Sequence, residues 1–270
     1  MSSTRLAVWG DPIAHSLSPA LHAAAYRELG LDWQYERRQV TAADFAATVQ
    51  SLDSTWRGLS LTMPLKEEGF RLAVHHDSPA QLTGAVNTLV LGDEPAGFNT
   101  DVGGIVDALA EAGITAASSA RILGAGATAA SALVALADLG ATRVEVRARR
   151  PDPARALTEL AQRLGVDVIA LPFDAPTTPV DLTIATLPSG TVLPREVAEP
   201  LAAAGGALFD AAYAPWPSAL ARAWGEATVV SGLGMLLHQA VRQIRIFTQG
   251  DPAAPLPQER AVISAMRAAL

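Results

Sequence analysis

The fold of this chain is constrained most by a glycine-rich turn that joins a short strand to a long helix. The turn is Gly124-Ala125-Gly126-Ala127-Thr128-Ala129; it follows the predicted strand 121–123, and an Ala/Leu-rich helix runs on to Gly140. Gly124 permits the tight turn, Gly126 lets the backbone approach a pyrophosphate at the helix N-terminus, and Ala129 allows close packing. An ordinary Gly-rich turn is the alternative, because Gly and Ala are abundant here. The strand–turn–helix context favours a dinucleotide-binding loop.

Apolar runs separated by helical segments extend this unit toward the C-terminus. Further strands are predicted at residues 143–148, 166–171, 182–185, 207–211 and 228–230. About five parallel strands with intervening helices make a Rossmann-type, doubly wound dinucleotide domain. The Pro-rich segments 172–179 and 252–257 are predicted to be loops.

The N-terminal part of the chain predicts a separate α/β domain. Strands are expected at 6–9, 58–62 and 85–91, and a helix from Ser18 to Leu29 has Ser18 as its cap, Pro19 at its first position and Gly30 as its stop. Helix 103–112 connects the domains, and helices 236–248 and 258–270 are inferred to return to the first one. The α/β fold therefore consists of a first domain, 1–101 plus about 236–270, and a Rossmann-type domain of about 102–235.

The end of the second Rossmann strand decides between two nicotinamide cofactors. NAD binders usually place Asp or Glu there, whereas this strand ends in Arg147-Ala148-Arg149-Arg150. Three guanidinium groups at this place favour the 2′-phosphate of NADP, because Arg pairs bidentately with phosphate. A solvated face is the alternative. Glu145 falls inside the strand, so we interpret it as solvated or salt-bridged.

Composition excludes several other classes of function. The formal net charge of −7 disfavours nucleic acid and anionic membrane surfaces as partners, and the lack of Cys excludes thiolate metal sites and thiol catalysis. The His residues form no metal-binding helix motif, so no metal is expected. We see no secretory signal and no membrane-spanning run, and therefore expect a soluble, cytoplasmic protein.

Polar side chains in the first domain are candidates for chemistry. Ser16 and Ser18 precede a helix and can bind a carboxylate, although Ser18 is equally explained as a cap. Lys66 follows a strand–Pro turn and can move a proton, although a solvated Lys is commoner. Asn87 in an apolar run is either internally bonded or faces a ligand. Asp101 lies at the domain junction, where a cleft is expected; a helix cap is the equal alternative.

Taken together, these segments resemble the shikimate dehydrogenases over nearly the full chain. The matching stretches, in the family's order, are 10–19, 61–66, 84–88, 99–101, 124–129, 210–215 and 232–239. Any one of them is weak, but the set is highly specific. The resemblance implies an NADP-dependent oxidoreductase of aromatic amino-acid (chorismate) biosynthesis that interconverts shikimate and 3-dehydroshikimate.

The resemblance also implies roles for individual residues. Lys66 and Asp101 form the catalytic pair. The substrate is bound by Ser16 and Ser18 at its carboxylate, by Thr62, Asn87 and Gln239, and by Tyr213 near the carboxylate. The cofactor is bound by the turn 124–129 and by Arg149, Arg150, Thr186, Gly232 and Met235. Departures from the family at Ser60 and Leu65 concern the substrate pocket; Ile184 also departs, and Ala148 and Arg150 concern the strictness of NADP preference.

Two alternatives stay open at this stage. A quinate/shikimate dehydrogenase using NAD is disfavoured by Arg149 and Ser18. A non-catalytic metabolite-binding member of the family is expected to have lost Lys66 or Asp101, and both are present. Small-molecule substrate binding is expected for a monomer or a homodimer.

Overall fold

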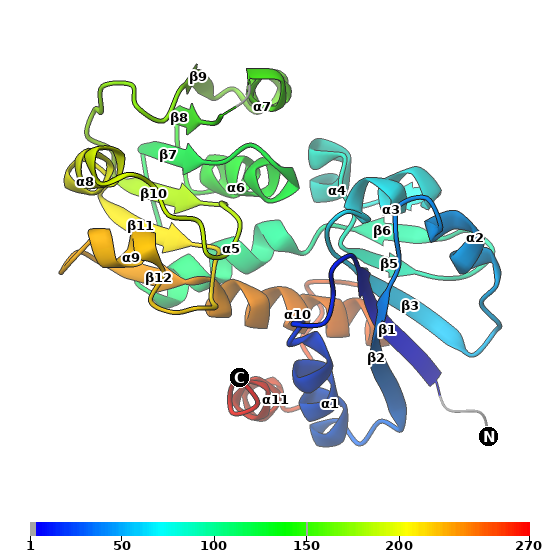
Figure 1. Cartoon of the computed structure of the whole chain (residues 1–270). Helices are drawn as coiled ribbons and strands as arrows, with labels where there is room; N and C mark the ends of the chain where they lie inside the picture. The colour runs from blue at the N-terminus through cyan, green and yellow to red at the C-terminus, as the bar shows by residue number, and fades with distance from the viewer. Residues whose placement is uncertain (1–3, 150) are drawn as a thin grey trace. The chain divides into compact units, whose positions relative to one another are not determined.

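The computed structural model describes residues 4–149 and 151–270, and the chain divides into two compact units. Unit 1 comprises Met1–Thr100 and Leu236–Leu270, and unit 2 comprises Asp101–Met235. Each unit contains its own six-stranded sheet (Figure 1). The α/β class predicted from the sequence is therefore confirmed.

The sheet of unit 1 is mixed, with the order β2-β1-β3-β5-β6-β4. Its strands are β1 (Thr4–Gly10), β2 (Trp33–Gln39), β3 (Trp56–Leu61), β4 (His75–His76), β5 (Thr88–Val90) and β6 (Ala96–Phe98). β1 pairs in parallel with β2 and β3, whereas β5 runs antiparallel to both β3 and β6. Strand β2 escaped prediction because it is a polar edge strand, exposed at most of its positions.

Helices cover both faces of this sheet. They are α1 (Ser18–Glu28), α2 (Phe45–Gln50), α3 (Lys66–Leu72), α4 (Ser78–Thr83), α10 (Gly232–Gln249) and α11 (Glu259–Arg267). Leu6 of β1 packs in one buried cluster with residues of α1, α10 and α11, while Ala7 and Trp9 pack in another with residues such as Phe45. The alternation along β1 is the two-residue period of a strand buried on both faces. The C-terminal helices thus return to the first unit, as predicted.

The sheet of unit 2 is parallel throughout, with the order β12-β11-β10-β7-β8-β9. Its strands are β7 (Ser119–Leu123), β8 (Arg143–Arg147), β9 (Asp167–Leu171), β10 (Leu182–Ala185), β11 (Ala207–Asp210) and β12 (Val229–Ser231). Counted along the chain, this is the strand order of dinucleotide-binding domains, and the order reverses between β7 and β10. The predicted strands lie within one or two residues of the observed ones.

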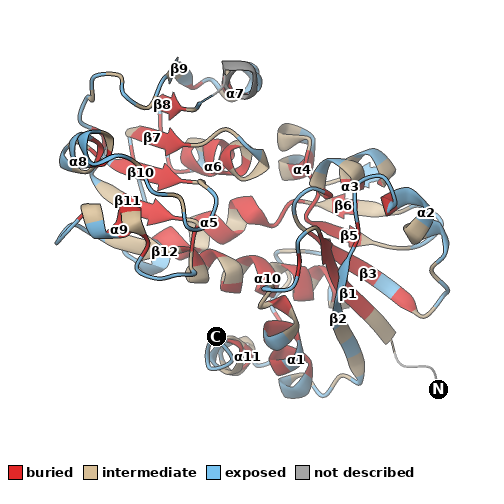
Figure 2. Cartoon of the chain, in the orientation of Figure 1, coloured by how far each residue is buried: buried red, intermediate tan, exposed pale blue. Residues whose placement is uncertain are grey.

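The helices of unit 2 complete the doubly wound arrangement. They are α5 (Asp101–Glu111), α6 (Ala127–Asp138), α7 (Pro151–Leu164), α8 (Arg195–Ala203) and α9 (Ala219–Ala223). The central strands of both sheets are buried along most of their length (Figure 2). Because parallel strands end at the same edge, the loops after β7, β8, β10 and β11 lie along one edge of the sheet.

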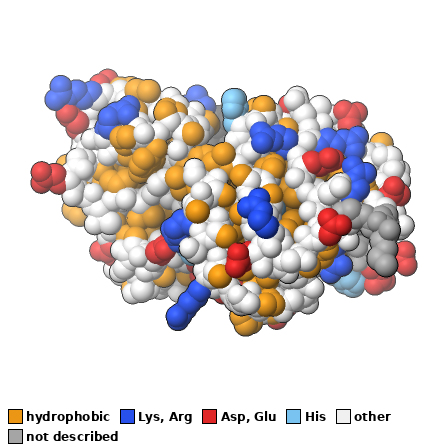
Figure 3. Space-filling model, turned by 90° about the horizontal axis from the view of Figure 1, so that it is seen from below, with side chains coloured by type: hydrophobic (Ala, Val, Ile, Leu, Met, Phe, Trp, Pro, Cys, Tyr) orange, Lys and Arg blue, Asp and Glu red, His pale blue; other side chains and the backbone are white. Residues whose placement is uncertain are grey.

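Two further features complete the description of the chain. On the face drawn in Figure 3, basic and acidic side chains are interspersed among apolar atoms rather than gathered by sign. Among the described residues, no helix has the length and apolar character that crossing a bilayer requires.

Candidate functional site

In unit 1 the predicted functional segments meet at one edge of the sheet. The loop after β1 and the loop after β3 are joined directly, since the N–H of Asp11 donates to the carbonyl of Met63 and that of Thr62 to the carbonyl of Trp9 (both 2.9 Å). Asn87 reaches the same edge from the antiparallel strand β5, where its carbonyl accepts from the Leu61 N–H at 2.8 Å. Segments far apart in the sequence therefore converge here.

The two serines lie on the loop that follows β1. The Ser16 hydroxyl accepts from the backbone N–H of Ser18 at 3.3 Å, so the two residues form one small turn. The predicted capping role of Ser18 is wrong: the residue at the N-cap of α1 is Leu17, without a side-chain cap. The Ser18 side chain is instead buried beside the Tyr35 phenol of β2.

Lys66 begins α3, directly after the Thr62-Met63-Pro64-Leu65 turn. The turn is closed by the Leu65 N–H, which donates to the Thr62 carbonyl at 2.8 Å, and the fully buried Leu65 anchors it in the core. The Lys66 carbonyl accepts from the Val86 N–H at 2.9 Å, which ties the start of α3 to the residue before Asn87. Thr62 and Lys66 are both partly exposed.

Asn87 is internally bonded, which is one of the two possibilities that the sequence left open. Its Oδ1 accepts from the Thr100 N–H and the Thr88 hydroxyl, and its Nδ2 donates to the Thr100 hydroxyl, each at 2.9 Å. Of the predicted strand 85–91, only Thr88–Val90 is a strand (β5), because Asn87 lies in a bend that these side-chain hydrogen bonds hold. Residue 101 follows Thr100 directly, so Asn87 braces the backbone from which Asp101 extends.

Asp101 and Gln239 are buried polar residues on helices. Asp101 is 4% exposed. It is the first residue of α5, so the connecting helix, predicted at 103–112, starts two residues earlier than expected. Gln239 on α10 is 7% exposed, and its Nε2 donates to the Leu236 carbonyl at 2.8 Å. Lys66 belongs to unit 1 and Asp101 to unit 2, and the crevice in which we expect them to meet stays a prediction.

The glycine turn of unit 2 lies at the point where the strand order reverses. Gly124 has a φ of +111°, and a Cβ on it would lie 2.5 Å from Oγ1 of Thr186, which follows β10. Gly126 is the N-cap of α6 with a φ of −90°, and no described atom would lie within 4 Å of an added Cβ. Ala129 is fully buried. Packing therefore requires glycine at 124, whereas the protein itself leaves room at 126.

The residues at the end of β8 divide into buried and exposed groups. Arg121 and Arg147 are fully buried, and both donate to the carboxylate of Glu145, Arg121 at 3.0 Å. Burial opposes ionisation of Glu145, but hydrogen bonds and charge from the two Arg outweigh it and lower its pKa. Arg147 also donates to the carbonyls of Phe173 and Ala175, in the Pro-rich loop after β9.

This arrangement corrects the predicted phosphate cluster. Arg147 cannot serve a phosphate, because its side chain lies on the sheet face that the Pro-rich loop covers and its donors are used there. Of the two interpretations of Glu145, the salt-bridged one is confirmed, and the carboxylate is buried. Arg149 is exposed just beyond the strand end, and Arg150 lies outside the described residues.

Other predicted cofactor and substrate residues follow the strands of unit 2: Thr186 and Tyr213 on loops, and Gly232 and Met235 in the first turn of α10. The Thr186 hydroxyl donates to the Leu123 carbonyl at 3.1 Å, which ties the loop after β10 to the start of the glycine turn. Tyr213 is half-buried, and burial raises the pKa of its phenol. Glycine at 232 lets the chain pass close to the loop after β11, since a Cβ there would lie 2.1 Å from the Ala211 carbonyl oxygen. Met235 is buried.

The loop that carries Tyr213 has a brace that the sequence did not reveal. The Asp210 carboxylate accepts from the Ser218 hydroxyl at 2.5 Å and from the Ala212 N–H at 3.0 Å. Ser218 in turn caps α9. Burial raises the pKa of Asp210 against these hydrogen bonds. An Asp at a strand end followed by a Ser-capped helix is the only local signal.

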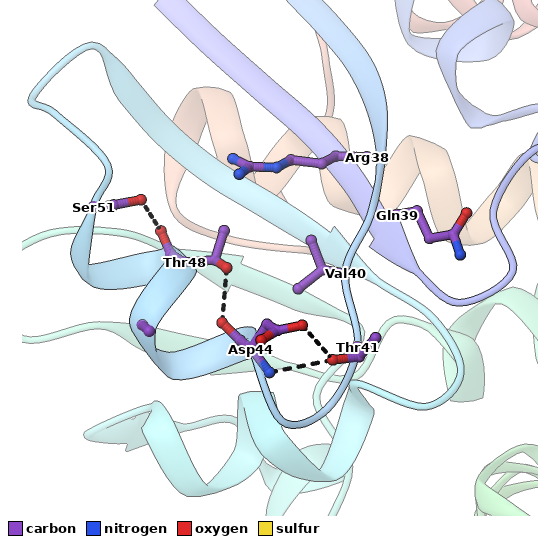
Figure 4. A pocket seen from close by; sticks show the side chains of 8 residues that line it. Arg38, Gln39, Val40, Thr41, Asp44, Thr48 and Ser51 are labelled. Atoms are coloured by element: carbon purple, nitrogen blue, oxygen red, sulfur yellow. Dashed lines mark hydrogen bonds between the residues drawn. The ribbon is translucent and has the colours of Figure 1, made fainter.

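A shallow pocket of about 600 Å³ lies elsewhere in unit 1 (Figure 4). It is lined by the end of β2 and by α2, away from the sequence-predicted residues. Its polar side chains bond locally: Thr41 donates to Asp44 Oδ2, and Thr48 to the Asp44 carbonyl, both at 2.7 Å. We place the functional site at the sheet edges and not here, because these groups are already used within one turn of chain.

Comparisons with known proteins identify the family of this chain. A model of the shikimate dehydrogenase substrate binding domain matches residues 8–89. The shikimate dehydrogenase (NADP(+)) of Methanothermobacter thermautotrophicus is 36% identical over 258 residues, which cover 91% of this chain and 91% of that protein. The chain belongs to the shikimate dehydrogenase family. The family resemblance drawn from the motifs is thereby confirmed, and residues 8–89 include Ser16, Ser18, Thr62, Lys66 and Asn87.

Solved structures of shikimate dehydrogenases share the fold of this member. The Mycobacterium tuberculosis shikimate dehydrogenase is 41% identical with a TM-score of 0.82, covering 98% of this chain and 99% of that one. The Thermus thermophilus shikimate 5-dehydrogenase, solved in complex with NADP(H) and shikimate, is 32% identical with a TM-score of 0.81, covering 99% and 100%.

Proposed function

We propose that this chain is an NADP-dependent shikimate dehydrogenase, which interconverts shikimate and 3-dehydroshikimate. One observation carries the proposal: in each of the two sheets, the motif residues of the family lie together at one edge. In unit 1 the loops after β1 and β3 and the start of β5 meet, and in unit 2 the glycine turn stands at the reversal point. Ligands of doubly wound sheets bind at such an edge.

The residues of unit 2 fit NADP. The space beside Gly126, at the N-terminus of α6, suits a pyrophosphate, which the helix end attracts. Glu145 is held by two guanidinium groups and is withdrawn from the ribose hydroxyls that an acid accepts in NAD enzymes. Arg149, exposed after β8, would hold the 2′-phosphate, with Arg150 beside it in sequence. Thr186, Gly232 and Met235 complete the proposed cofactor site.

In unit 1 we propose that Ser16 and Ser18 bind the substrate carboxylate. Thr62, Asn87 and Gln239 would bond the remaining polar groups of the ring, with Tyr213 of unit 2 near the carboxylate. Burial of Ser18, Asn87 and Gln239 restricts their rotamers, so they can orient a substrate with little further loss of entropy. We propose accordingly that the first unit is the substrate domain and the second the dinucleotide domain.

Proton transfer is the task of the chain's own side chains. When bound, NADP supplies the hydride chemistry at the carbon that carries the 3-hydroxyl. Lys66 takes the proton of that hydroxyl during oxidation and returns it to the carbonyl oxygen during reduction. Asp101 acts with Lys66, holding its amino group, which is the neutral amine when it accepts the proton, in line with the hydroxyl. Asn87 and Thr100 brace the backbone next to Asp101.

A paired assay tests the proposal. Purified protein is assayed with shikimate and with quinate, each with NADP and with NAD. We expect turnover of shikimate with NADP to exceed the other three combinations. Preference for NAD with comparable turnover of quinate identifies a quinate/shikimate dehydrogenase, and binding of shikimate without turnover identifies a non-catalytic member.

The role of Lys66 has its own test. We expect Lys66→Ala to lower kcat at least about a hundredfold with little change in shikimate affinity, because a positioned acid/base contributes about 10²–10⁴-fold. Glu67→Ala, at the neighbouring exposed position of α3, is the matched control. A folded Lys66→Ala protein with the turnover of the wild type removes Lys66 from this role.

We further propose that the enzyme works in chorismate and aromatic amino-acid biosynthesis in the cytoplasm. The lack of Cys in the sequence fits a reducing compartment. Its partner is the small substrate, and the family likeness leaves both a monomer and a homodimer open to measurement by light scattering.

A further inference from the structure

Beneath the serine and asparagine of the proposed substrate site lies a buried hydrogen-bond network that spans unit 1. We call it the Gln243 network. It joins α1, β2, β3 and α10, and it ends at the backbone of Asn87; its side chains are His22, Tyr26, Tyr35, Ser60 and Gln243. Its centre is dry, with His22 0%, Gln243 2% and Ser60 3% exposed.

The amide of Gln243 sets the direction of every bond in the centre. Its Nε2 donates to the carbonyl of Asn87 at 3.1 Å, and a carbonyl can only accept. Its Oε1 therefore points the other way and accepts from the Ser60 hydroxyl at 2.9 Å and from Nε2 of His22 at 3.2 Å. The amide has one orientation that satisfies all three partners.

The outer bonds follow from this assignment. Because Nε2 of His22 donates, Nδ1 accepts, and the Tyr26 hydroxyl donates to it at 3.0 Å. Burial lowers the pKa of His22 to about 3, so its ring is neutral and holds this single tautomer at neutral pH. The Ser60 hydroxyl, which donates to Gln243, accepts from Tyr35 at 2.7 Å.

Tyr35 carries the network to the carboxylate end of the proposed site. Its hydroxyl donates to Ser60 at 2.7 Å and lies beside the side chain of Ser18. Its ring stacks on His22, with the centroids 3.8 Å apart and the planes 13° apart. The stacking leaves the Tyr35 hydroxyl little freedom to move away from Ser18. Ser18 thus packs beside one end of this hydrogen-bonded chain, and the carbonyl of Asn87 is bonded at the other.

We propose that Gln243 is a positioning residue for the substrate: its amide holds Asn87 from below and, through Ser60, fixes the Tyr35 hydroxyl beside which Ser18 packs. An apolar side chain of equal size would fill the space but leave the buried His22, Ser60 and Asn87 carbonyl without their hydrogen bonds to residue 243. The hydroxyl of Ser18 and the loop of Asn87 would then sample other orientations, and substrate binding would weaken. The inference rests on the proposed function, since it assigns both ends to the shikimate site.

The variant Gln243→Met tests the proposal, because it keeps the length of the side chain and removes its hydrogen bonds. We expect the KM for shikimate to rise about five- to twentyfold, the value of one or two lost hydrogen bonds, with kcat and the KM for NADP within about twofold of the wild type. The matched control is Val241→Ala, a buried truncation on the same helix that lies outside the network. It should lower Tm and leave the KM for shikimate unchanged.

A double-mutant cycle distinguishes positioning from general destabilisation. Tyr35→Phe removes the hydroxyl that donates to Ser60 beside Ser18, so it should raise the KM for shikimate in the same direction. The double variant should raise that KM by less than the product of the single effects, because both changes break one chain. If Gln243→Met does not fold, Tyr35→Phe tests the proposal instead: an unchanged KM for shikimate in Tyr35→Phe overturns it.

Two results overturn the inference. One is a folded Gln243→Met protein with the wild-type KM for shikimate; the other is a rise in KM that Val241→Ala reproduces. Failure of the proposed function itself gives a different result, because the wild type would then turn over neither shikimate nor 3-dehydroshikimate with NADP.

Discussion

The stability of this protein should depend on pH through one buried histidine. His22 is fully buried, stacked on Tyr35, and bonded through both ring nitrogens to Tyr26 and Gln243. Removal from water lowers its pKa from 6.5 to about 3, and the hydrogen bond to Gln243 only partly offsets this. The folded protein therefore keeps His22 neutral at pH values where the unfolded chain protonates it.

The size of the effect follows from the two pKa values. Below pH 6.5 the unfolded state binds a proton that the folded state does not, so the free energy of unfolding falls as the pH falls, down to about pH 3. Each unit of pH in this window contributes about 1.4 kcal/mol. Between pH 7.5 and pH 5.0 the loss from His22 alone is about 2 kcal/mol, because its titration begins near 6.5.

Urea unfolding of the wild type and of His22→Phe at pH 7.5, 6.0 and 5.0 measures this loss. Phenylalanine keeps the ring and the stacking, so the variant is less stable at pH 7.5 through its lost hydrogen bonds but has no proton to bind at this position. The stability difference between the two proteins should shrink by about 2 kcal/mol from pH 7.5 to 5.0. Since all other groups are common to both proteins, a difference that stays constant with pH would refute the reasoning.

Three further predictions concern unit 2. Glu145→Gln should lower the free energy of unfolding by about 3–5 kcal/mol in urea titrations, because it leaves two buried guanidinium groups without their counter-charge; a loss below about 1 kcal/mol would mean that the carbonyls of the Pro-rich loop suffice. Gly126→Ala should change the free energy of unfolding by less than about 1 kcal/mol, because the protein leaves room for a Cβ there, yet raise the KM for NADP at least about tenfold. Gly124→Ala should lower the free energy of unfolding by about 1–3 kcal/mol even without cofactor, because its φ of +111° strains a residue with a Cβ. Arg149→Ala should raise the KM for NADP and leave that for NAD almost unchanged in steady-state kinetics; equal weakening of both contradicts a phosphate role.

Local patterns in the sequence were sufficient for the main elements. The parallel strands of unit 2 were predictable because they are short, apolar and bounded by turn residues, and the central ones are buried. Gly30 and Gly140, both with positive φ, mark helix ends. Strand β2 was not predictable, since only Trp33 and Tyr35 of this edge strand pack on the core and its other residues are exposed Gln, Glu and Arg, too short an alternation to indicate a strand. The cap of α1 was misassigned because Ser18 is already the first residue of the helix, where its side chain packs beside Tyr35, which only the folded chain brings near.

By itself, the sequence determined the fold class, the glycine turn and the set of motif residues, because each depends on neighbours within a few positions along the chain. Only the tertiary structure decided where long polar side chains point. Arg147 and Glu145 became a buried ionic cluster with Arg121, and Gln243 met His22 across 221 residues of chain. Such groups must find partners once they leave water, and which partners are in reach depends on how the elements pack.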